Sequence, residues 1–206
     1  MTIKELHSLE SSLIPIADLL VNEPCKGLAA VLVPLQKVKG QWHLLLTLRS
    51  SQLRHHAGEV AFPGGMWEEG DTYPVATALR ESEEEIALPK ESVVLLGGLE
   101  EIPTRQNTRV RPVVAGIEEN VPLTANIDEI AAIFTVPIRF FLEDQRLRTD
   151  IFTRQHGARP VQHWVPAYQY GEYEIWGFTA AVIMRLMNRC FEADIRREHS
   201  APEKIW

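Results

Sequence analysis

Four glutamates lie within the six residues of the stretch RESEEE, from Arg80 to Glu85. Negative charges one helical turn apart repel one another, so a folded chain that concentrates them needs a reason to do so. A run of this kind, taken alone, is usually a solvated helix face. A divalent cation is the chemical alternative, because Mg²⁺ and Mn²⁺ prefer oxygen ligands and are readily held by two or three carboxylates.

Helical geometry gathers three of these four carboxylates. At about 100° per residue, Glu81, Glu84 and Glu85 share one face, and Glu83 points elsewhere. Arg80, which opens the run, could hold one glutamate through a bidentate pair. The apolar stripe that would fix the helix to a core consists of Val75, Leu79, Ser82 and Ile86.

Two glycines, Gly64 and Gly65, precede the helix and can shape a loop whose backbone approaches a ligand closely. The helix itself is predicted from about Tyr73 to Ile86, with Asp71 or Thr72 as its N-cap. A glycine turn followed by an acidic helix therefore predicts a site for a metal ion and a diphosphate.

The remaining elements must carry this loop and helix. The runs GLAAVLVPLQ and WHLLLTL, on either side of a turn at Gly40, predict a hairpin. A short strand GEVAF comes before the glycines. Later strands are predicted at SVVLLGGLEEI, VRPVVAGI, VQHWVPAY and YEIW, and a last helix at about 177–195. The run EIAAIFTVPI fits a strand or a helix equally well. This order predicts an α+β fold with a mixed sheet between helices.

Composition limits the classes of protein to consider. The 206 residues, 45% hydrophobic and 24% charged, suit one soluble domain over 1–206, with a helical extension at about 1–25. A net charge of -7 argues against nucleic acids and anionic membranes as partners. The two cysteines, Cys25 and Cys190, show no zinc spacing, and the sequence contains neither a signal-peptide pattern nor a membrane-spanning run. We expect a cytoplasmic protein, and a homodimer stays open.

A known motif now fits these residues. The segment GGMWEEGDTYPVATALRESEEEIAL resembles the Nudix box, G-x5-E-x7-R-E-U-x-E-E-x-G-U, in which U is a bulky aliphatic residue. The matching positions are Gly65, Arg80, Glu81, Glu84, Glu85 and Leu88. There are three departures: Asp71 replaces the first glutamate with one extra residue before Arg80, Ser82 replaces an aliphatic residue, and Ala87 replaces the glycine after the acids.

The upstream segment LLTLRSSQLRHHAGEVAFPGG resembles the signature of the coenzyme A diphosphatase branch of that superfamily. The resemblance implies an α/β/α sandwich and a hydrolysis that depends on Mg²⁺ or Mn²⁺. It also implies the substrate, coenzyme A or a derivative, and the products, 3',5'-ADP and 4'-phosphopantetheine or its acyl form. Glu81 and Glu85 are the first choice for metal ligands, with Glu84 as a third ligand or general base and Arg80 as a further catalytic residue.

The substrate is expected to contact residues of both motifs and one later strand: Arg49, Arg54, Gly64, Gly65 and Arg109. Guanidinium groups suit phosphates, and Arg105, Arg109 and Arg111 form one candidate patch. Glu129 lies where some Nudix proteins carry an extra catalytic acid, and a strand-edge or capping role fits it equally well. Two alternatives stay open: hydrolysis of another nucleoside diphosphate such as ADP-ribose, and a sensor that binds a nucleotide without catalysis.

Overall fold

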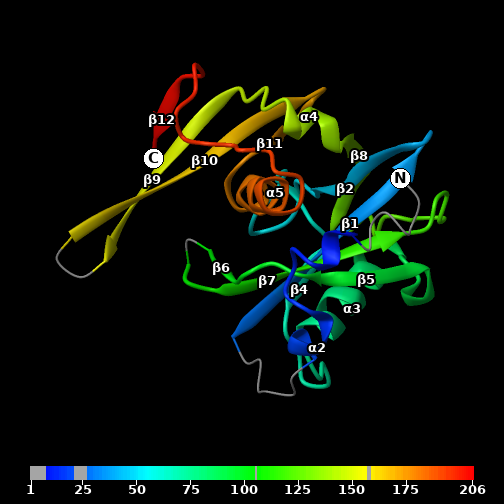
Figure 1. Ribbon diagram of the computed structural model, residues 1–206. Helices are drawn as coiled ribbons and strands as arrows, with labels where there is room; N and C mark the ends of the chain where they lie inside the picture. Colours follow the sequence, from blue (N-terminus) through cyan, green and yellow to red (C-terminus); the bar gives the residue numbers. More distant parts are fainter. Residues whose placement is uncertain (1–7, 21–26, 105, 157–158) are drawn as a thin grey trace. The chain divides into compact units, whose positions relative to one another are not determined.

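The computed structural model describes residues 8–20, 27–104, 106–156 and 159–206, in two compact units (Figure 1). The first unit ends at Ile138 of the chain, and the second begins at Arg139. The sequence predicted one domain over 1–206, and this remains a prediction beside the two compact units of the structure. Cys25 and Arg105 lie outside the described residues. No helix in the described part of the chain is long and apolar enough to cross a membrane.

The first unit is built on a mixed eight-stranded sheet. Its strands are β1 (Leu28–Val38), β2 (Gln41–Arg49), β3 (Val60–Ala61), β4 (Gly64–Met66), β5 (Val93–Gly98), β6 (Ile102–Pro103), β7 (Arg109–Ile117) and β8 (Ile130–Pro137). Its helices are α2 (Ile16–Leu19), α3 (Pro74–Ile86) and the 3-10 turn η1 (Lys90–Ser92). Strand β1 pairs with β7 in parallel and with β2 and β4 in antiparallel fashion. The predicted α+β class with a mixed sheet is confirmed.

The predicted hairpin is strands β1 and β2, joined where Val38 pairs with Gln41. Lys39 and Gly40 form its turn, and both have positive φ, 49° and 80°. Two consecutive residues with positive φ match the right-handed twist of the flanking strands, which is why a glycine in this turn favours a tight hairpin. The ambiguous run EIAAIFTVPI forms strand β8, which pairs with β2. The periodicity of this run fits a strand or a helix, and pairing with the distant strand β2 makes it a strand.

Helix α3 packs against β1 and β4 on one face of the sheet (Figure 1). Val75, Ala78 and Ile86 from the helix join Ala30 and other sheet residues in one buried hydrophobic cluster. Of the predicted stripe, Leu79 is only partly buried. The predicted N-cap is wrong: Tyr73 occupies that position without a side-chain hydrogen bond, and Pro74 follows at the first turn. Proline suits this place because its missing N–H would have had no helical partner.

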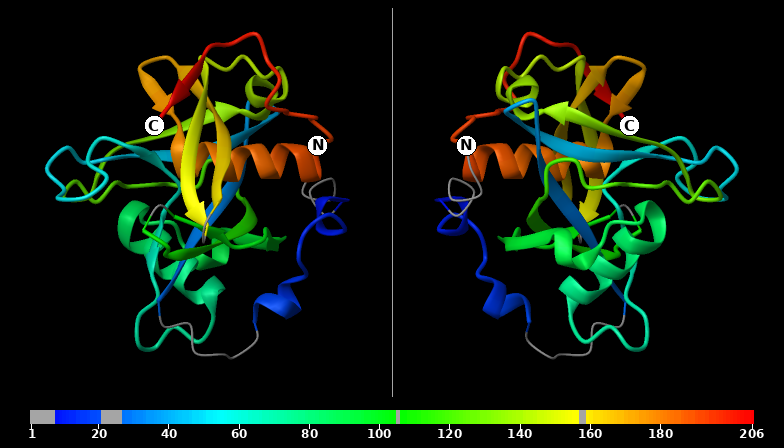
Figure 2. Two further views of the ribbon diagram at one scale, coloured as in Figure 1. Left: turned by 90° about the vertical axis from the view of Figure 1, so that its left-hand side faces the viewer. Right: turned by 90° about the vertical axis from the view of Figure 1, so that its right-hand side faces the viewer.

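The second unit contains a four-stranded sheet in the order β11-β10-β9-β12. Its strands are β9 (Arg148–His156), β10 (Arg159–Tyr170), β11 (Tyr173–Ile175) and β12 (Glu203–Ile205), and its helices are α4 (Ile138–Leu142), which starts at the division, and α5 (Gly177–Cys190). Figure 2 shows the β9–β10 hairpin and α5 from two sides. The helix ends earlier than the expected residue 195, because Glu192 and Asp194 have positive φ. Trp176, at its start, stacks on Trp206.

Candidate metal and diphosphate site

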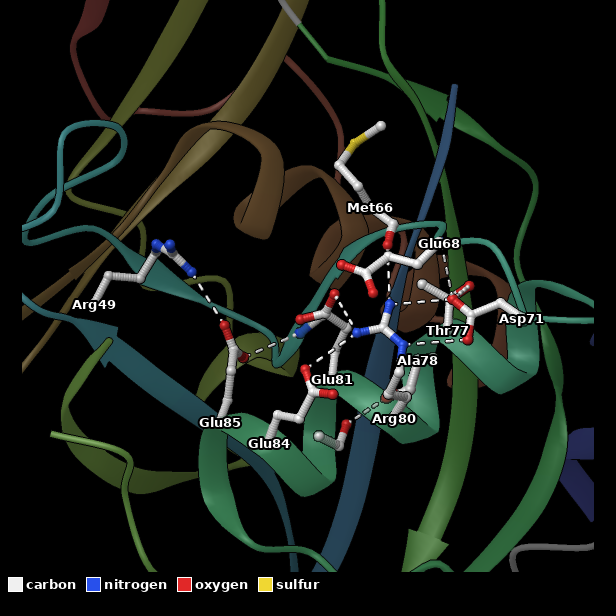
Figure 3. A network of polar contacts seen from close by, with 12 residues as sticks. Arg49, Met66, Glu68, Asp71, Thr77, Ala78, Arg80, Glu81, Glu84 and Glu85 are labelled. Carbon is white, nitrogen blue, oxygen red and sulfur yellow. Dashed lines mark hydrogen bonds and ion pairs between the residues drawn. The ribbon is translucent and has the colours of Figure 1, made fainter. Parts of the chain in front are cut away.

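Arg80 connects the loop before α3 with the acidic face of that helix (Figure 3). Its Nε and one terminal nitrogen bind both oxygens of Asp71, at 3.2 and 3.1 Å, and the latter nitrogen also donates to the Met66 carbonyl at 3.1 Å. The other terminal nitrogen lies 3.1 Å from a carboxylate oxygen of Glu81 and 3.1 Å from one of Glu84. The guanidinium therefore orients two glutamates at once, and its bidentate partner is Asp71 rather than a glutamate.

The contacts of Asp71 explain why it is not the N-cap of α3. Its carboxylate accepts the Glu68 N–H at 3.1 Å and the Thr77 hydroxyl at 2.8 Å, in addition to Arg80. Burial acts to raise the pKa of Asp71, but the hydrogen bonds from Arg80, from the Glu68 N–H and from Thr77 outweigh it and hold that pKa below its ordinary value. Asp71 thus connects the loop to the helix through Thr77 and Arg80, and its carboxylate is engaged there instead of capping the helix.

Glu85 is the most enclosed member of the acidic run, with an exposed fraction of 2%. One carboxylate oxygen accepts the backbone N–H of Gly64 at 3.2 Å, and the other lies 3.2 Å from Arg49 Nη1. Burial raises the pKa of Glu85 to about 7, in spite of these two contacts. An ionised carboxylate at this depth is costly unless positive charge lies close to it.

Glu81 lies against the glycine pair. A Cβ atom on Gly65 would come within 2.3 Å of a Glu81 carboxylate oxygen, so a larger residue at this position would displace the Glu81 carboxylate. A Cβ atom on Gly64 would meet the Ala30 carbonyl oxygen at 2.3 Å, and Gly64 has a φ of +156°. The two glycines thus have different tasks: Gly64 lets β4 approach β1, and Gly65 leaves room for Glu81.

A fourth carboxylate comes from outside the helix. Burial raises the pKa of Glu81, with Arg80 opposing it and with Glu84 and Glu129 adding to it by charge repulsion. Glu129 also raises the pKa of Glu85, after burial, and so does Glu81. Glu81, Glu85 and Glu129 therefore lie close enough for their negative charges to repel one another. The structure brings the sequence candidate Glu129 to the acidic face of α3.

Backbone hydrogen bonds hold Glu129 in this place. The Ser50 N–H donates to the Glu129 carbonyl at 2.7 Å, directly after the end of β2. The Asn126 N–H donates to the Glu85 carbonyl at 2.9 Å, and the Thr124 N–H to the Ile86 carbonyl at 3.0 Å. The segment before β8 is thus tied both to the end of β2 and to the last turn of α3.

The carboxylates of the acidic run are the candidate ligands for a divalent cation. Within the described ranges no three acidic, histidine or cysteine side chains stand together as a preassembled metal cage. Arg80 instead pairs with Glu81 and Glu84, and Arg49 with Glu85. The donor set nevertheless suits Mg²⁺ or Mn²⁺, because it consists of carboxylates that are partly desolvated and mutually repelling. Burial raises the pKa of both Glu81 and Glu85, so these are the carboxylates whose charge a cation would relieve most.

The other sequence candidates are distributed unevenly. Arg49 donates a hydrogen bond to the Glu85 carboxylate. Arg54 is exposed, and within the described residues it forms no ion pair with a carboxylate of the site. Arg109 and Arg111 share Glu101, at 3.2 and 2.9 Å, and lie on β7. The expected patch also included Arg105, which lies outside the described residues.

Sequence reasoning missed two partners of the candidate residues, Thr77 and Glu101. Thr77 lies six residues from Asp71, and helical spacing places it on the buried side, so its hydroxyl carried no separate signal. Glu101 follows the β5 pattern as an ordinary charged residue. Only the antiparallel pairing of Ile102 with Val110 brings it beside the two arginines.

Comparisons with known proteins agree with this geometry. A family model described as the NUDIX domain matches residues 26–174. A protein of Escherichia coli O7:K1 (strain IAI39) named uncharacterized Nudix hydrolase NudL is 41% identical over 159 residues, which are 77% of this chain and 80% of that protein. The protein of the same name from Escherichia fergusonii is 42% identical with the same coverage.

A solved structure shows the same fold. The MutT/nudix family protein from Enterococcus faecalis superposes with a TM-score of 0.51 at 17% identity, over 93% of this chain and 75% of that one. The box residues that Arg80 holds together, the family match and the fold all agree, and the chain belongs to the Nudix family.

Proposed function

We propose that this Nudix hydrolase cleaves the diphosphate of coenzyme A or a derivative to 3',5'-ADP and 4'-phosphopantetheine or its acyl form. The observation that carries the proposal is the meeting of two motifs at one carboxylate. Arg49 and Gly64 belong to the segment that resembles the coenzyme A branch, and both contact Glu85 of the Nudix box. These contacts support a role for Arg49 and Gly64 at the proposed reaction centre, where they can affect which diphosphate is cleaved.

The chain's own residues supply position and charge. Glu81 and Glu85 would hold Mg²⁺ or Mn²⁺, with Glu84 or Glu129 as further ligand or general base. When bound, the cation supplies neutralisation of the diphosphate and a lower pKa for the attacking water. Arg80 keeps Glu81 and Glu84 oriented. Gly65 leaves room for the Glu81 carboxylate against the backbone.

Substrate choice is assigned to arginines at a distance from the carboxylates. Arg109 and Arg111 lie on one face of β7, and Glu101 holds them as a pair. A 3'-phosphate could replace the Glu101 carboxylate as their partner, since both are anions that accept bidentate hydrogen bonds from guanidinium groups. We therefore expect coenzyme A to be preferred over dephospho-coenzyme A.

The test is product analysis by mass spectrometry with coenzyme A, dephospho-coenzyme A and ADP-ribose, each with Mg²⁺ or Mn²⁺. We expect 3',5'-ADP from coenzyme A and about a tenfold advantage in kcat/KM over the dephospho form, the factor of one charge-assisted hydrogen bond. Arg109→Ala should reduce that advantage and leave the dephospho form unaffected. If ADP-ribose is the better substrate, the chain acts on a different nucleoside diphosphate. Absence of turnover with all three would favour a nucleotide-binding sensor.

A further inference from the structure

Arg49 and Arg80 both neutralise glutamates of α3, but they are held very differently. Arg80 is bidentate on Asp71 and makes further contacts with Met66 and two glutamates. Arg49 reaches Glu85 through a single nitrogen at 3.2 Å. Its Nε is buried and has no hydrogen-bond partner among the described residues. Arg80 is therefore part of the framework, and the Arg49 contact is one that can be exchanged.

The two oxygens of Glu85 differ in the same way. Oε2 accepts the N–H of Gly64, the first residue of β4. Gly64 pairs with Val31 of β1, and the β1 backbone leaves no room for a Cβ atom there. Among the described residues, Oε1 accepts a hydrogen bond from Arg49 alone. A change of partner at Oε1 therefore requires no movement of the backbone, whereas a change at Oε2 would disturb the sheet.

We propose that Arg49 is an internal counter-ion that neutralises Glu85 in the metal-free protein and withdraws from Oε1 when a divalent cation binds there. The proposal rests on the metal site of the proposed function. A cation binds a carboxylate oxygen at about 2.0–2.1 Å for Mg²⁺. The guanidinium and the cation would then carry like charges around one oxygen, so one of them has to leave. Arg49 is the group that can, because its backbone position does not depend on the ion pair.

Backbone contacts support that independence. The Arg49 N–H donates to the Glu59 carbonyl at 3.0 Å, and the Arg49 carbonyl accepts the Gly58 N–H at 3.2 Å. The side chain is about a quarter exposed, at 23%, so it has solvent on one side into which it can turn. Its unpartnered Nε can then serve an incoming phosphate oxygen, which is an acceptor suited to a guanidinium.

Competition of this kind makes an unusual prediction: removal of Arg49 should improve metal binding and weaken the metal-free protein. We expect Arg49→Gln to bind Mn²⁺ about tenfold more tightly by calorimetry or by electron paramagnetic resonance, a factor of ten being typical of one charge-assisted contact. Its metal-free Tm should fall, and the rise in Tm on adding Mn²⁺ should exceed that of the wild type. Arg49→Lys, which keeps the charge, should stay close to the wild type in both.

The matched control is Lys90→Gln, which removes an exposed ion pair to Glu83 in the same acidic run. It should leave the Mn²⁺ affinity unchanged within about twofold, because a pair in contact with solvent is strongly screened. Unchanged or weaker Mn²⁺ binding in Arg49→Gln would overturn the proposal, and so would equal tightening in Lys90→Gln. A wild type that binds no Mn²⁺ would instead refute the metal site of the proposed function, which keeps the two failures apart.

Discussion

Replacing Glu85 with glutamine should make the metal-free protein more stable at pH 8. The substitution keeps the shape and an acceptor for the Gly64 N–H and removes a carboxylate that is 2% exposed. Burial raises the pKa of this group from 4.5 to about 7. At 1.36 kcal/mol for each factor of ten, the ionised form opposes folding by roughly 3 kcal/mol at most. A gain of about 1 to 3 kcal/mol is expected, since glutamine retains the hydrogen bonds imperfectly.

The dependence on pH identifies the cause. A group whose pKa is higher in the folded protein binds its proton more tightly there, so the free energy of unfolding falls as the pH rises from about 4.5 to about 7. Above pH 7 the ionised carboxylate destabilises the wild type by the full amount. Below pH 4.5 the free energies of unfolding of the wild type and Glu85→Gln should become similar. Urea unfolding of both proteins with chelator, at several pH values, measures this difference. A difference that does not change with pH would refute the reasoning, as would a variant less stable at pH 8.

The control for this prediction is Glu84→Gln, since that side chain is 57% exposed. Its metal-free stability should change by less than about 0.5 kcal/mol at any pH. Activity should follow the opposite order from stability. With saturating Mg²⁺, Glu85→Gln should lose roughly a hundredfold or more in kcat, because an anionic ligand that holds catalytic charge is gone. Turnover close to normal would remove Glu85 from the site.

Other positions give sharp contrasts. Gly65→Ala should lower kcat at least about tenfold with a stability change within ~1 kcal/mol, because its Cβ meets only the flexible end of Glu81. Gly64→Ala should cost roughly 2 kcal/mol or more in urea unfolding, because its Cβ meets backbone at positive φ. Ala87→Gly should stabilise by about 1 kcal/mol, seen as a higher Tm, because Ala87 has a φ of 53°. Asp71→Asn should cost about 1–3 kcal/mol and reduce kcat together with Tm, and an unchanged Tm would contradict its bracing role.

Periodicity predicted the part of the site that lies within one helix. The shared face of Glu81, Glu84 and Glu85 follows from 3.6 residues per turn, and so does the separate position of Glu83, which pairs with Lys90. The comparison with the Nudix box also identified Ala87 as the residue that replaces the glycine after the acids. The structure gives that residue, Ala87, the left-handed conformation at the end of the helix.

Contacts between distant segments could not be predicted in the same way. Periodicity placed Glu85 on the acidic face, but its buried carboxylate contacts Arg49 and Gly64, which lie more than twenty residues earlier in the chain. The approach of Glu129 depends on a bond from Ser50 at the end of another strand. Spacing along one element does not encode pairings of this kind, because they form only when the sheet is assembled.

Strand β1 sets the backbone spacing between the glycine pair and the arginine pair. Ala30 pairs with Gly65 of β4 on one side and with Arg111 of β7 on the other. Two neighbouring strand spacings of about 4.8 Å therefore set some 10 Å between the backbones of Gly65 and Arg111, through hydrogen bonds that loops cannot alter. Changes in the surrounding loops would leave this backbone span unchanged. A change of that span would require a register shift in the central strand, which would turn its buried side chains to the wrong face.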